Sequence, residues 1–256
     1  MLPPKSHPRY HSLMTREKLV EGVKMGVTAI QGLIAHGRGE AFDYILGEKS
    51  RNFALKAEKA AVAMMLLANH PVISVNGNAA ILSGKEIAEL SKIVNAKVEV
   101  NVFHFSRERV QKIKKYLDQF GIEVLAACDA ELKGLESARR IVDSRGILIA
   151  DVVLVPLEDG DRCEILKKHK KKVIAIDLNP LSRTSLMADI TIVDNITRAI
   201  PNMIKFAREL KDKSKEELEK IVSEYDNKKI LAEAIISIRE YLTERVNEVL
   251  GLGESN

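Results

Sequence analysis

Hydrophobic positions follow three different patterns along the chain. Between residues 72 and 194, short runs rich in β-branched residues alternate with amphipathic segments. The runs are apolar at most consecutive positions, which is typical of strands in a parallel sheet covered by helices on both faces. The six strand candidates are residues 72–75, 98–102, 123–127, 152–155, 173–176 and 190–193. Strand, helix, strand at this spacing, with right-handed crossovers, predicts an α/β fold with a doubly wound, mainly parallel sheet.

Two helices between these strands have predictable ends. Ser83 and Glu86 are three residues apart, as in a capping box, and predict that a helix opens there. Ser106 begins another amphipathic helix, and Gly121 is the residue type that commonly follows a helix end.

Residues 1–70 are predicted to form a helical N-terminal extension. A first helix follows Thr15, and a glycine-bearing break over residues 32–40 separates it from a helix that includes 54–67. That helix ends before Pro71, because the residue preceding a proline is disfavoured in helical geometry. The sheet and its helices then occupy residues 71–203.

Residues 204–256 are predicted to be C-terminal helices. Ser214 and Glu217 form a second capping box. The last helix carries one apolar stripe, at Leu231, Ile235, Ile238, Leu242, Val246 and Val249. Two explanations stay open for this stripe: it covers the chain's own sheet, or it contacts a second copy in a dimer.

Composition narrows the class of protein. The 256 residues include only two cysteines, Cys128 and Cys163, and no CxxC pair, which disfavours a disulfide framework and a zinc ribbon. The longest purely apolar run, 60–68, is too short to span a bilayer, and the first residues lack a signal-peptide core. Basic and acidic residues nearly balance, 40 against 36, unlike a dedicated nucleic-acid binder. We therefore expect a cytoplasmic protein that acts on neither membranes nor nucleic acid.

Familiar catalytic motifs are missing from this sequence. Gly77 and Gly84-Lys85 resemble a P-loop, but six residues separate the glycines and Glu86 replaces the magnesium-binding hydroxyl. Gly37 and Gly39 match two glycines of a dinucleotide fingerprint, but Phe42 replaces the third. The histidines show no metal-ligand spacing, so no protein metal site is predicted.

Polar residues cluster where the predicted strands end. Ligands of open parallel sheets bind outside the carboxyl ends of the strands, so these residues are the candidates for a binding site. They follow the first, second, third, fifth and sixth strands: Asn76, Gly77 and Asn78; His104 and Arg107; Cys128 and Asp129; Asp177 to Thr184; and Asp194 to Arg198. Each group alone could be an ordinary turn or loop, but turns alone do not explain five such groups.

Several segments together resemble the archaeal phosphopantothenate synthetases, the 4-phosphopantoate–β-alanine ligases of coenzyme A biosynthesis. The resemblance covers residues 4–203, and its most specific block is GLIAHGRGEAFDY at 32–44. The other segments are KSHPRY at 5–10, TREK at 15–18, SVNGNAA at 74–80, DLNPLSRTS at 177–185 and DNITR at 194–198.

The resemblance implies a homodimeric, ATP-dependent ligase with a Rossmann-like core. Such an enzyme joins 4-phosphopantoate to β-alanine and releases AMP and diphosphate. The nucleotide contacts that the resemblance implies are Arg16, Arg38, Asp177, Leu178, Asn179, Arg183, Thr184, Asn195 and Ile196.

The chemistry of these residue types agrees with that assignment. Arginine binds phosphate through a fixed, bidentate donor fork, and Arg16, Arg38 and Arg183 are expected in loops or at helix caps. Asp177 can accept hydrogen bonds from the nucleoside. We expect an acyl-adenylate mechanism in which positioning and charge stabilisation supply the catalysis. Mg²⁺ is expected to arrive with ATP, held by phosphates and water more than by protein.

The phosphate of phosphopantoate needs donors separate from those of ATP. The turn at Asn76, Gly77 and Asn78 is the candidate, with His104 and Arg107 supplying further hydrogen bonds. Arg38 and His36 are the catalytic candidates. His36 either bridges the two substrates, accepts the proton of the amine, or is a neutral structural histidine.

Two other function classes remain open at this point. One is a different nucleotide-using enzyme on the same sheet, such as an NAD-dependent transferase. The other is a non-catalytic nucleotide sensor whose C-terminal helices signal to a partner. The sequence does not identify the β-alanine pocket.

Overall fold

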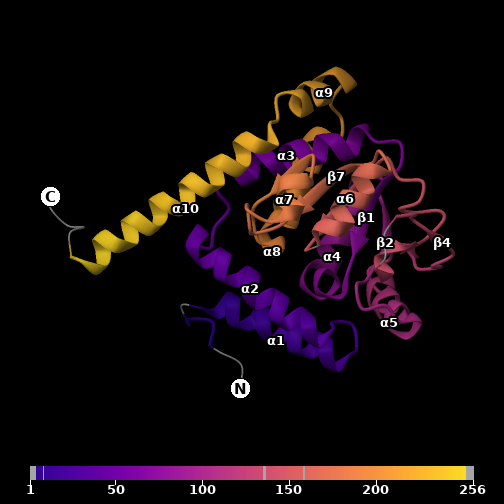
Figure 1. The fold of residues 1–256 in the computed structure, drawn as a ribbon, viewed down its shortest axis with the longest axis horizontal. Coiled ribbons are helices and arrows are strands. Elements are labelled where there is room, and N and C mark those ends of the chain that lie inside the picture. The colour runs from indigo at the N-terminus through magenta and orange to yellow at the C-terminus, as the bar shows by residue number, and fades with distance from the viewer. Residues whose placement is uncertain (1–3, 8, 135–136, 158, 252–256) are drawn as a thin grey trace.

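The computed structural model describes residues 4–7, 9–134, 137–157 and 159–251 of the chain, and its centre is a six-stranded parallel sheet (Figure 1). The strands are β1 (Pro71–Val75), β2 (Lys97–Val100), β3 (Val124–Leu125), β6 (Val152–Pro156), β7 (Lys172–Ile176) and β8 (Ile190–Ile192). Their order is β3-β2-β1-β6-β7-β8, and all five pairings are parallel. The six predicted strands and the Rossmann-like, doubly wound α/β fold are thereby confirmed.

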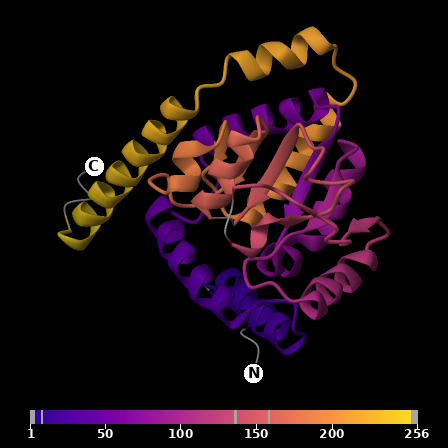
Figure 2. The same cartoon turned by 45° about the vertical axis from the view of Figure 1, so that its right-hand side comes forward.

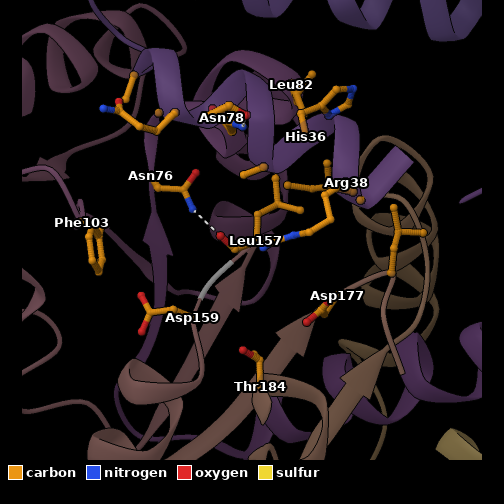
Figure 3. Close-up of a pocket in the computed structure, with 18 of the residues that line it drawn as sticks. His36, Arg38, Asn76, Asn78, Leu82, Phe103, Leu157, Asp159, Asp177 and Thr184 are labelled. Carbon is orange, nitrogen blue, oxygen red and sulfur yellow. Dashed lines mark hydrogen bonds between the residues drawn. The ribbon is translucent and has the colours of Figure 1, made fainter. Parts of the chain in front are cut away.

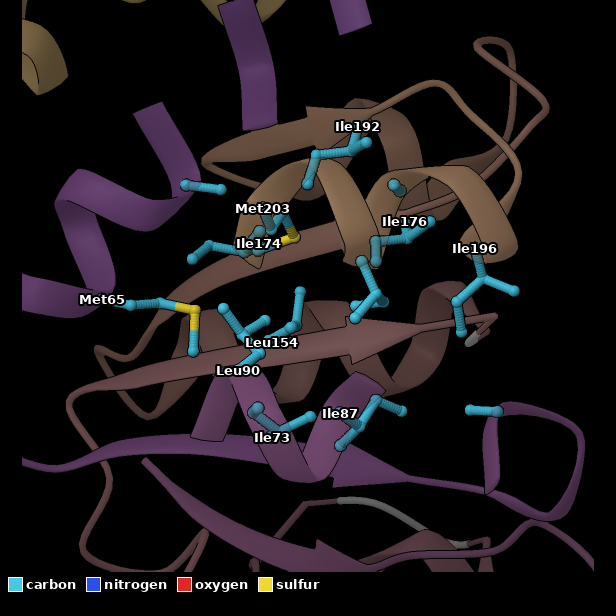
Figure 4. Packing of buried hydrophobic residues seen from close by; sticks show 14 of the residues in the cluster. Met65, Ile73, Ile87, Leu90, Leu154, Ile174, Ile176, Ile192, Ile196 and Met203 are labelled. Carbon is cyan, nitrogen blue, oxygen red and sulfur yellow. The ribbon is translucent and has the colours of Figure 1, made fainter. Parts of the chain in front are cut away.

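Helices cover both faces of this sheet because its strands are apolar on both sides. One face packs against α3 (Asn52–Leu67), α4 (Gly77–Ile93), α5 (Arg107–Asp118) and α8 (Ile196–Leu210). Figure 4 shows Leu154 and Ile174 of the sheet meeting Met65, Leu90 and Met203 of these helices. The opposite face packs against α6 (Gly160–Lys168) through Val153, Val155 and Leu166. Adjacent side chains of β6 therefore pack into the cores on opposite faces of the sheet, because successive side chains of a strand point to opposite faces.

The helical extension before the sheet differs from the prediction at two points. Thr15 lies inside α1 (Tyr10–Lys24), where its hydroxyl donates to the His11 carbonyl. The expected break at residues 32–40 is continuous helix within α2 (Ile30–Leu46). Asn78 of α4 donates to the Gly32 carbonyl at 2.8 Å, and a Cβ on Gly32 would lie 2.4 Å from the Asn78 amide oxygen. Glycine at that position therefore permits close helix packing instead of ending the helix.

The predicted start of α4 at Ser83 is wrong. The helix begins six residues earlier, at Gly77, where the Asn76 side chain accepts a hydrogen bond from the Ala79 N–H at 3.0 Å. Ser83 instead marks a kink, with φ −144° and ψ 24°, and its hydroxyl points to the Ile196 carbonyl at 3.5 Å. The expected start of α5 after Ser106 is confirmed.

The sequence analysis did not predict a small antiparallel pair of strands, β4 (Ala130–Glu131) and β5 (Ile141–Val142), or the 3₁₀ turn η1 (Ala138–Arg140). Two-residue strands are too short to show a hydrophobic period. Their position depends on distant groups, since Asn101 donates to the Ile141 carbonyl at 2.8 Å.

Three further helices complete the described chain: α7 (Arg183–Met187), α9 (Lys215–Ser223) and α10 (Asn227–Val249). The capping box at Ser214 and Glu217 is confirmed as the start of α9. The first half of α10 buries Ile230, Leu231 and Ala234 against the body, whereas its second half stands clear of the sheet (Figure 1; Figure 2). None of the helices within the described ranges is long and apolar enough to cross a membrane.

Candidate active site

A cavity of about 690 Å³ opens at the carboxyl ends of the central strands. Its floor is formed by the loops that follow β1, β2, β6, β7 and β8, and α2 forms a wall above them (Figure 3). The cavity includes the point where the strand order reverses, between β1 and β6. Ligand sites of doubly wound sheets lie at such a point, because neighbouring loops there diverge to opposite faces.

Most residues that the sequence singled out line this cavity. They are His36, Arg38, Asn76, Gly77, Asn78, His104, Asp177, Leu178, Asn179, Arg183, Thr184, Asn195 and Ile196. Those that follow strands come from segments far apart in the chain and are brought to one edge by the parallel sheet, whereas His36 and Arg38 reach the cavity from α2.

Arg16 and Arg107 do not line the cavity. Arg16 lies within α1, against an adjoining hollow that it shares with His36, and its guanidinium pairs with Glu40 at 3.1 Å. Arg107 is the exposed first residue of α5. The expected loop or cap position is thus wrong for Arg16, and also for Arg38, which lies inside α2.

Five polar residues of the lining were not named as candidates in the sequence analysis: Gln31, Glu40, Arg109, Arg139 and Asp159. Asp159 follows β6, so the same rule about strand ends, applied to the fourth predicted strand, would have found it. Arg139 belongs to the 3₁₀ turn η1, and no motif or period in the sequence marks that position.

Asp177 and Arg38 face each other at the β7 side of the cavity. The Asp177 carboxylate accepts hydrogen bonds from the Asn179 N–H, at 2.9 Å, and from the Ser182 hydroxyl. Burial raises the pKa of Asp177, and the nearby Arg38 charge acts against that shift. Arg38 extends into the cavity above Asp177 (Figure 3), and it forms no ion pair or hydrogen bond with any other described residue. The site therefore presents a cation that is available to an anionic ligand.

Arg183 is the first residue of α7 and lies at the rim of the same side. Its guanidinium contacts two carboxylates of α6, Asp161 at 2.7 Å and Glu164 at 2.9 Å. A ligand phosphate at this rim would compete with these exposed partners, whose contribution to stability is small.

The turn after β1 is built by its own side chains. The Asn76 amide donates to the carbonyls of Pro156 and Leu157, at 3.1 and 3.0 Å, and so joins α4 to the end of β6 (Figure 3). Gly77 passes so close to the preceding loop that a Cβ would lie 2.2 Å from the Val27 carbonyl oxygen. The Asn78 amide is engaged with α2. What this turn offers an anion is thus the first-turn N–H groups and positive end of α4, more than the two amide side chains.

His36 lies where the cavity and the Arg16 hollow meet. Its Nε2 atom is buried and has no hydrogen-bond partner among the described residues. Burial lowers the pKa of the imidazole, although the Glu40 charge raises it. His36 is therefore neutral at pH 7 and can accept a proton.

A buried ionic network holds α2 against the strand end that carries Asn195. Arg198 of α8 makes a bidentate contact with Asp43 of α2, with N–O distances of 2.6 and 3.2 Å. The same guanidinium contacts Asp194, directly after β8, at 2.6 Å. Asn195 adds a hydrogen bond to Asp43 at 2.9 Å. The network fixes Arg38 and Asn195, on opposite sides of the cavity, relative to each other.

Glu58 of α3 lies beside this network and is fully buried. Its two carboxylate oxygens have no hydrogen-bond partner among the described residues. Burial, the largest cause, and the Asp194 charge together raise the pKa of Glu58 to about 9, although the Arg198 charge acts against this shift. Glu58 is therefore protonated at neutral pH, which removes one of three negative charges around the single Arg198.

Comparison with known proteins gives one consistent result. The family model of phosphopantothenate/pantothenate synthetase matches residues 53–241. A Thermococcus kodakarensis protein is 56% identical over 248 residues, covering 96% of this chain and 95% of its own length. A Methanosarcina mazei protein is 58% identical over 93% of this chain and 95% of its own, and one from Methanospirillum hungatei is 49% identical over 96% and 99%. All three are named 4-phosphopantoate–beta-alanine ligase.

We expect Arg198→Leu to lower the free energy of unfolding by about 3–5 kcal/mol, because Asp43 and Asp194 would remain buried without a cation. Arg208→Leu, on the same helix, is the matched control. Its exposed pair with Glu89 should contribute less than about 1 kcal/mol. Urea unfolding of both variants measures the two losses. Equal losses would mean that the network does not stabilise the fold.

The raised pKa of Glu58 predicts that the stability of the fold depends on pH. Its pKa is about 9 in the folded chain against an ordinary value of 4.5, so folding takes up a proton between these pH values. The free energy of unfolding should therefore fall as pH rises through this window, by at most about 1.4 kcal/mol per pH unit from this group. Glu58→Gln should remove that part of the slope.

Urea unfolding at pH 6, 7 and 8 measures the effect, with Glu219→Gln, an exposed position, as the control. A Glu58→Gln slope that matches the control would show that Glu58 is already ionised at neutral pH.

Proposed function

This chain belongs to the phosphopantothenate/pantothenate synthetase family, and we propose that it joins 4-phosphopantoate to β-alanine with ATP to make 4′-phosphopantothenate for coenzyme A biosynthesis. The observation that carries this proposal is the arrangement of anion-binding groups. They lie at two separate places along one cavity, as a reaction between two phosphorylated substrates requires.

ATP is proposed to bind at the β7 and β8 side. Asp177, Asn179 and the first turn of α8 at Asn195 and Ile196 supply polar groups there for the nucleoside. Arg38 and Arg183 supply the cations, and Arg16 would reach the nucleotide only by leaving its contact with Glu40. Within the described ranges no group of three or more His, Cys, Asp or Glu side chains could hold a metal ion. A magnesium ion brought by ATP would then be held mainly by phosphate oxygens and water.

Phosphopantoate is proposed to bind at the β1 and β2 side. Its phosphate would lie against the first turn of α4, at Gly77 and Asn78, with His104 and a basic side chain of α5 completing the site. Arg109 lines the cavity and donates to the His104 carbonyl at 3.0 Å. Geometry therefore favours Arg109 over Arg107 as this basic residue.

The reaction proposed for this geometry has two steps. The phosphopantoate carboxylate attacks the α-phosphorus of ATP and releases diphosphate. The amine of β-alanine then attacks the acyl-adenylate and releases AMP. Arg38 would stabilise the charge that develops at the α-phosphate, and the neutral His36 would accept a proton from the amine. No covalent bond to the enzyme is needed.

The decisive assay identifies the nucleotide product when all three substrates are present. Sustained release of AMP and diphosphate should require both phosphopantoate and β-alanine. ADP would contradict the acyl-adenylate, and nucleotide turnover independent of both acids would contradict the ligase. Binding of ATP without any turnover would favour a nucleotide sensor, whereas turnover that requires NAD would favour a transferase.

Substitutions at the two ends of the cavity should separate the two phosphorylated substrates. We expect Arg109→Ala to raise KM for phosphopantoate about ten- to a hundredfold, the loss of one charge-assisted hydrogen bond, with KM for ATP nearly unchanged. Arg38→Ala should chiefly impair the use of ATP. Arg107→Ala is the matched control, since its side chain is outside the cavity lining. A larger effect for Arg107→Ala than for Arg109→Ala would reverse the assignment within α5.

We also propose that two copies associate through the outer half of α10. Leu242, Val246 and Val249 are exposed there on a helix that stands clear of the body (Figure 2). An exposed apolar stripe of this kind is typical of an interface, and twofold pairs are the commonest oligomers.

The mass in solution tests this association. Light scattering should give twice the chain mass of 28.5 kDa, and Leu242→Glu with Val246→Glu should give a single chain by burying charge in the interface. Glu244→Gln on the same helix is the control and should leave the dimer intact. A stable 28.5 kDa species for the unmodified protein would contradict the dimer.

A further inference from the structure

Three carboxylates line the cavity within the described part of the chain: Glu40, Asp159 and Asp177. Glu40 points toward α1, where it pairs with Arg16, and Asp177 belongs to the β7 side proposed for ATP. Asp159 follows β6, which lies between β1 and β7 in the sheet. Asp159 is thus the carboxylate at the middle of the cavity.

The middle of the cavity is where the chemistry must occur. If ATP lies before β7 and β8 and phosphopantoate before β1 and β2, the reacting carboxyl and α-phosphate meet in front of β6. Figure 3 shows Asp159 below Leu157, between Phe103 on the phosphopantoate side and Thr184 on the ATP side. An amine that attacks the activated carboxyl must approach this same place.

Asp159 is paired with Arg139, and hydrogen bonds to neighbouring segments position both. One Asp159 oxygen caps α6 by accepting the Arg162 N–H at 2.9 Å, and the other lies 2.6 Å from the Arg139 Nε. Arg139 donates to the Asn101 carbonyl at 3.2 Å, and its own carbonyl accepts from the Arg162 guanidinium at 2.6 Å. The cavity therefore presents one negative and one positive charge side by side.

This arrangement complements a short zwitterion. β-Alanine carries an ammonium and a carboxylate separated by two methylene groups, and these charges match those of Asp159 and Arg139 with opposite sign. A carboxylate is also a bidentate partner for guanidinium. An amine without a carboxylate would satisfy at most half of the pair.

We propose that Asp159 and Arg139 form the β-alanine subsite, with Asp159 binding the ammonium and Arg139 the carboxylate. This inference rests on the proposed function. In the amide-forming step the β-alanine nitrogen bonds to the carboxyl carbon of the adenylate, and the bond from that carbon to the phosphate oxygen breaks. AMP leaves with that electron pair, and of the two surplus protons of the ammonium one passes to solvent and the other to His36.

Asp159→Asn tests the subsite without removing the cap of α6, because asparagine caps helices as well as aspartate does. KM for β-alanine should rise about ten- to a hundredfold, the range for one charge-assisted hydrogen bond, with KM for ATP and phosphopantoate nearly unchanged. Exchange of labelled diphosphate into ATP, which needs phosphopantoate but no β-alanine, should stay within about twofold of the unmodified enzyme. Asp118→Asn, on the exposed face of α5, is the control.

The Arg139 half of the subsite is tested by a change of amine. The unmodified enzyme should prefer β-alanine over propylamine, which has a similar shape but no carboxylate. Arg139→Gln should lower that preference at least tenfold. Should this buried substitution prevent folding, the same comparison of amines on the unmodified enzyme tests the need for a carboxylate.

Three results would overturn the proposal. An unchanged KM for β-alanine in Asp159→Asn would remove Asp159 from the subsite. Parallel loss of diphosphate exchange and amide formation would place Asp159 in the first step or in structure alone. No preference of the unmodified enzyme for β-alanine over propylamine would remove the role of Arg139. Absence of phosphopantoate-dependent exchange in the unmodified enzyme would instead overturn the acyl-adenylate proposal itself, and this inference with it.

Discussion

The contact between Arg198 and Asp43 determines where one wall of the cavity lies. Helix α2 is not part of the sheet, yet it carries Arg38 and His36 over the strand ends. Toward its start, Asn78 holds it to α4; toward its end, Arg198 holds it to the loop after β8. Arg38 lies between these two anchors. Because the Arg198 network is buried, its geometry is well defined, and neither carboxylate can lose its cation without a large desolvation cost.

The same network explains why a buried glutamate can sit beside two aspartates. Arg198 neutralises only part of the charge of Asp43 and Asp194, so a third carboxylate at Glu58 is accommodated as the neutral acid. Glu58 is thus a buried polar side chain that adds no charge to the core at neutral pH. On the β7 and β8 side of the cavity, next to this network, Arg38 is a cation that has no ion pair within the described part of the chain.

Strand order separates the two sides of the cavity. The loops after β1 and β2 lie on one side of β6, and those after β7 and β8 on the other. Two anionic substrates can then be held by different donors and approach each other only at β6. The charge pair of Asp159 and Arg139 lies at that approach, where we infer that the third substrate, a zwitterion, is bound.

The sequence by itself determined the sheet, the helices α5 and α9, and most residues of the cavity edge. Apolar runs of the right length specify buried strands locally, and polar residues after them must meet once the strands are parallel. Side-chain caps such as Ser214 with Glu217 act over three residues, so the sequence predicts them too.

The sequence did not predict the start of α4, because Asn76 competes with Ser83 as a cap and the end of β1 decides between them. The glycines of α2 suggested a break, since local propensity does not include the close packing of Asn78. Only the tertiary structure paired Arg198 with Asp43, 155 residues away, and Arg139 with Asp159. An ion pair between residues far apart in the chain forms only after folding, and no local period or motif in the sequence indicates which residues will be partners.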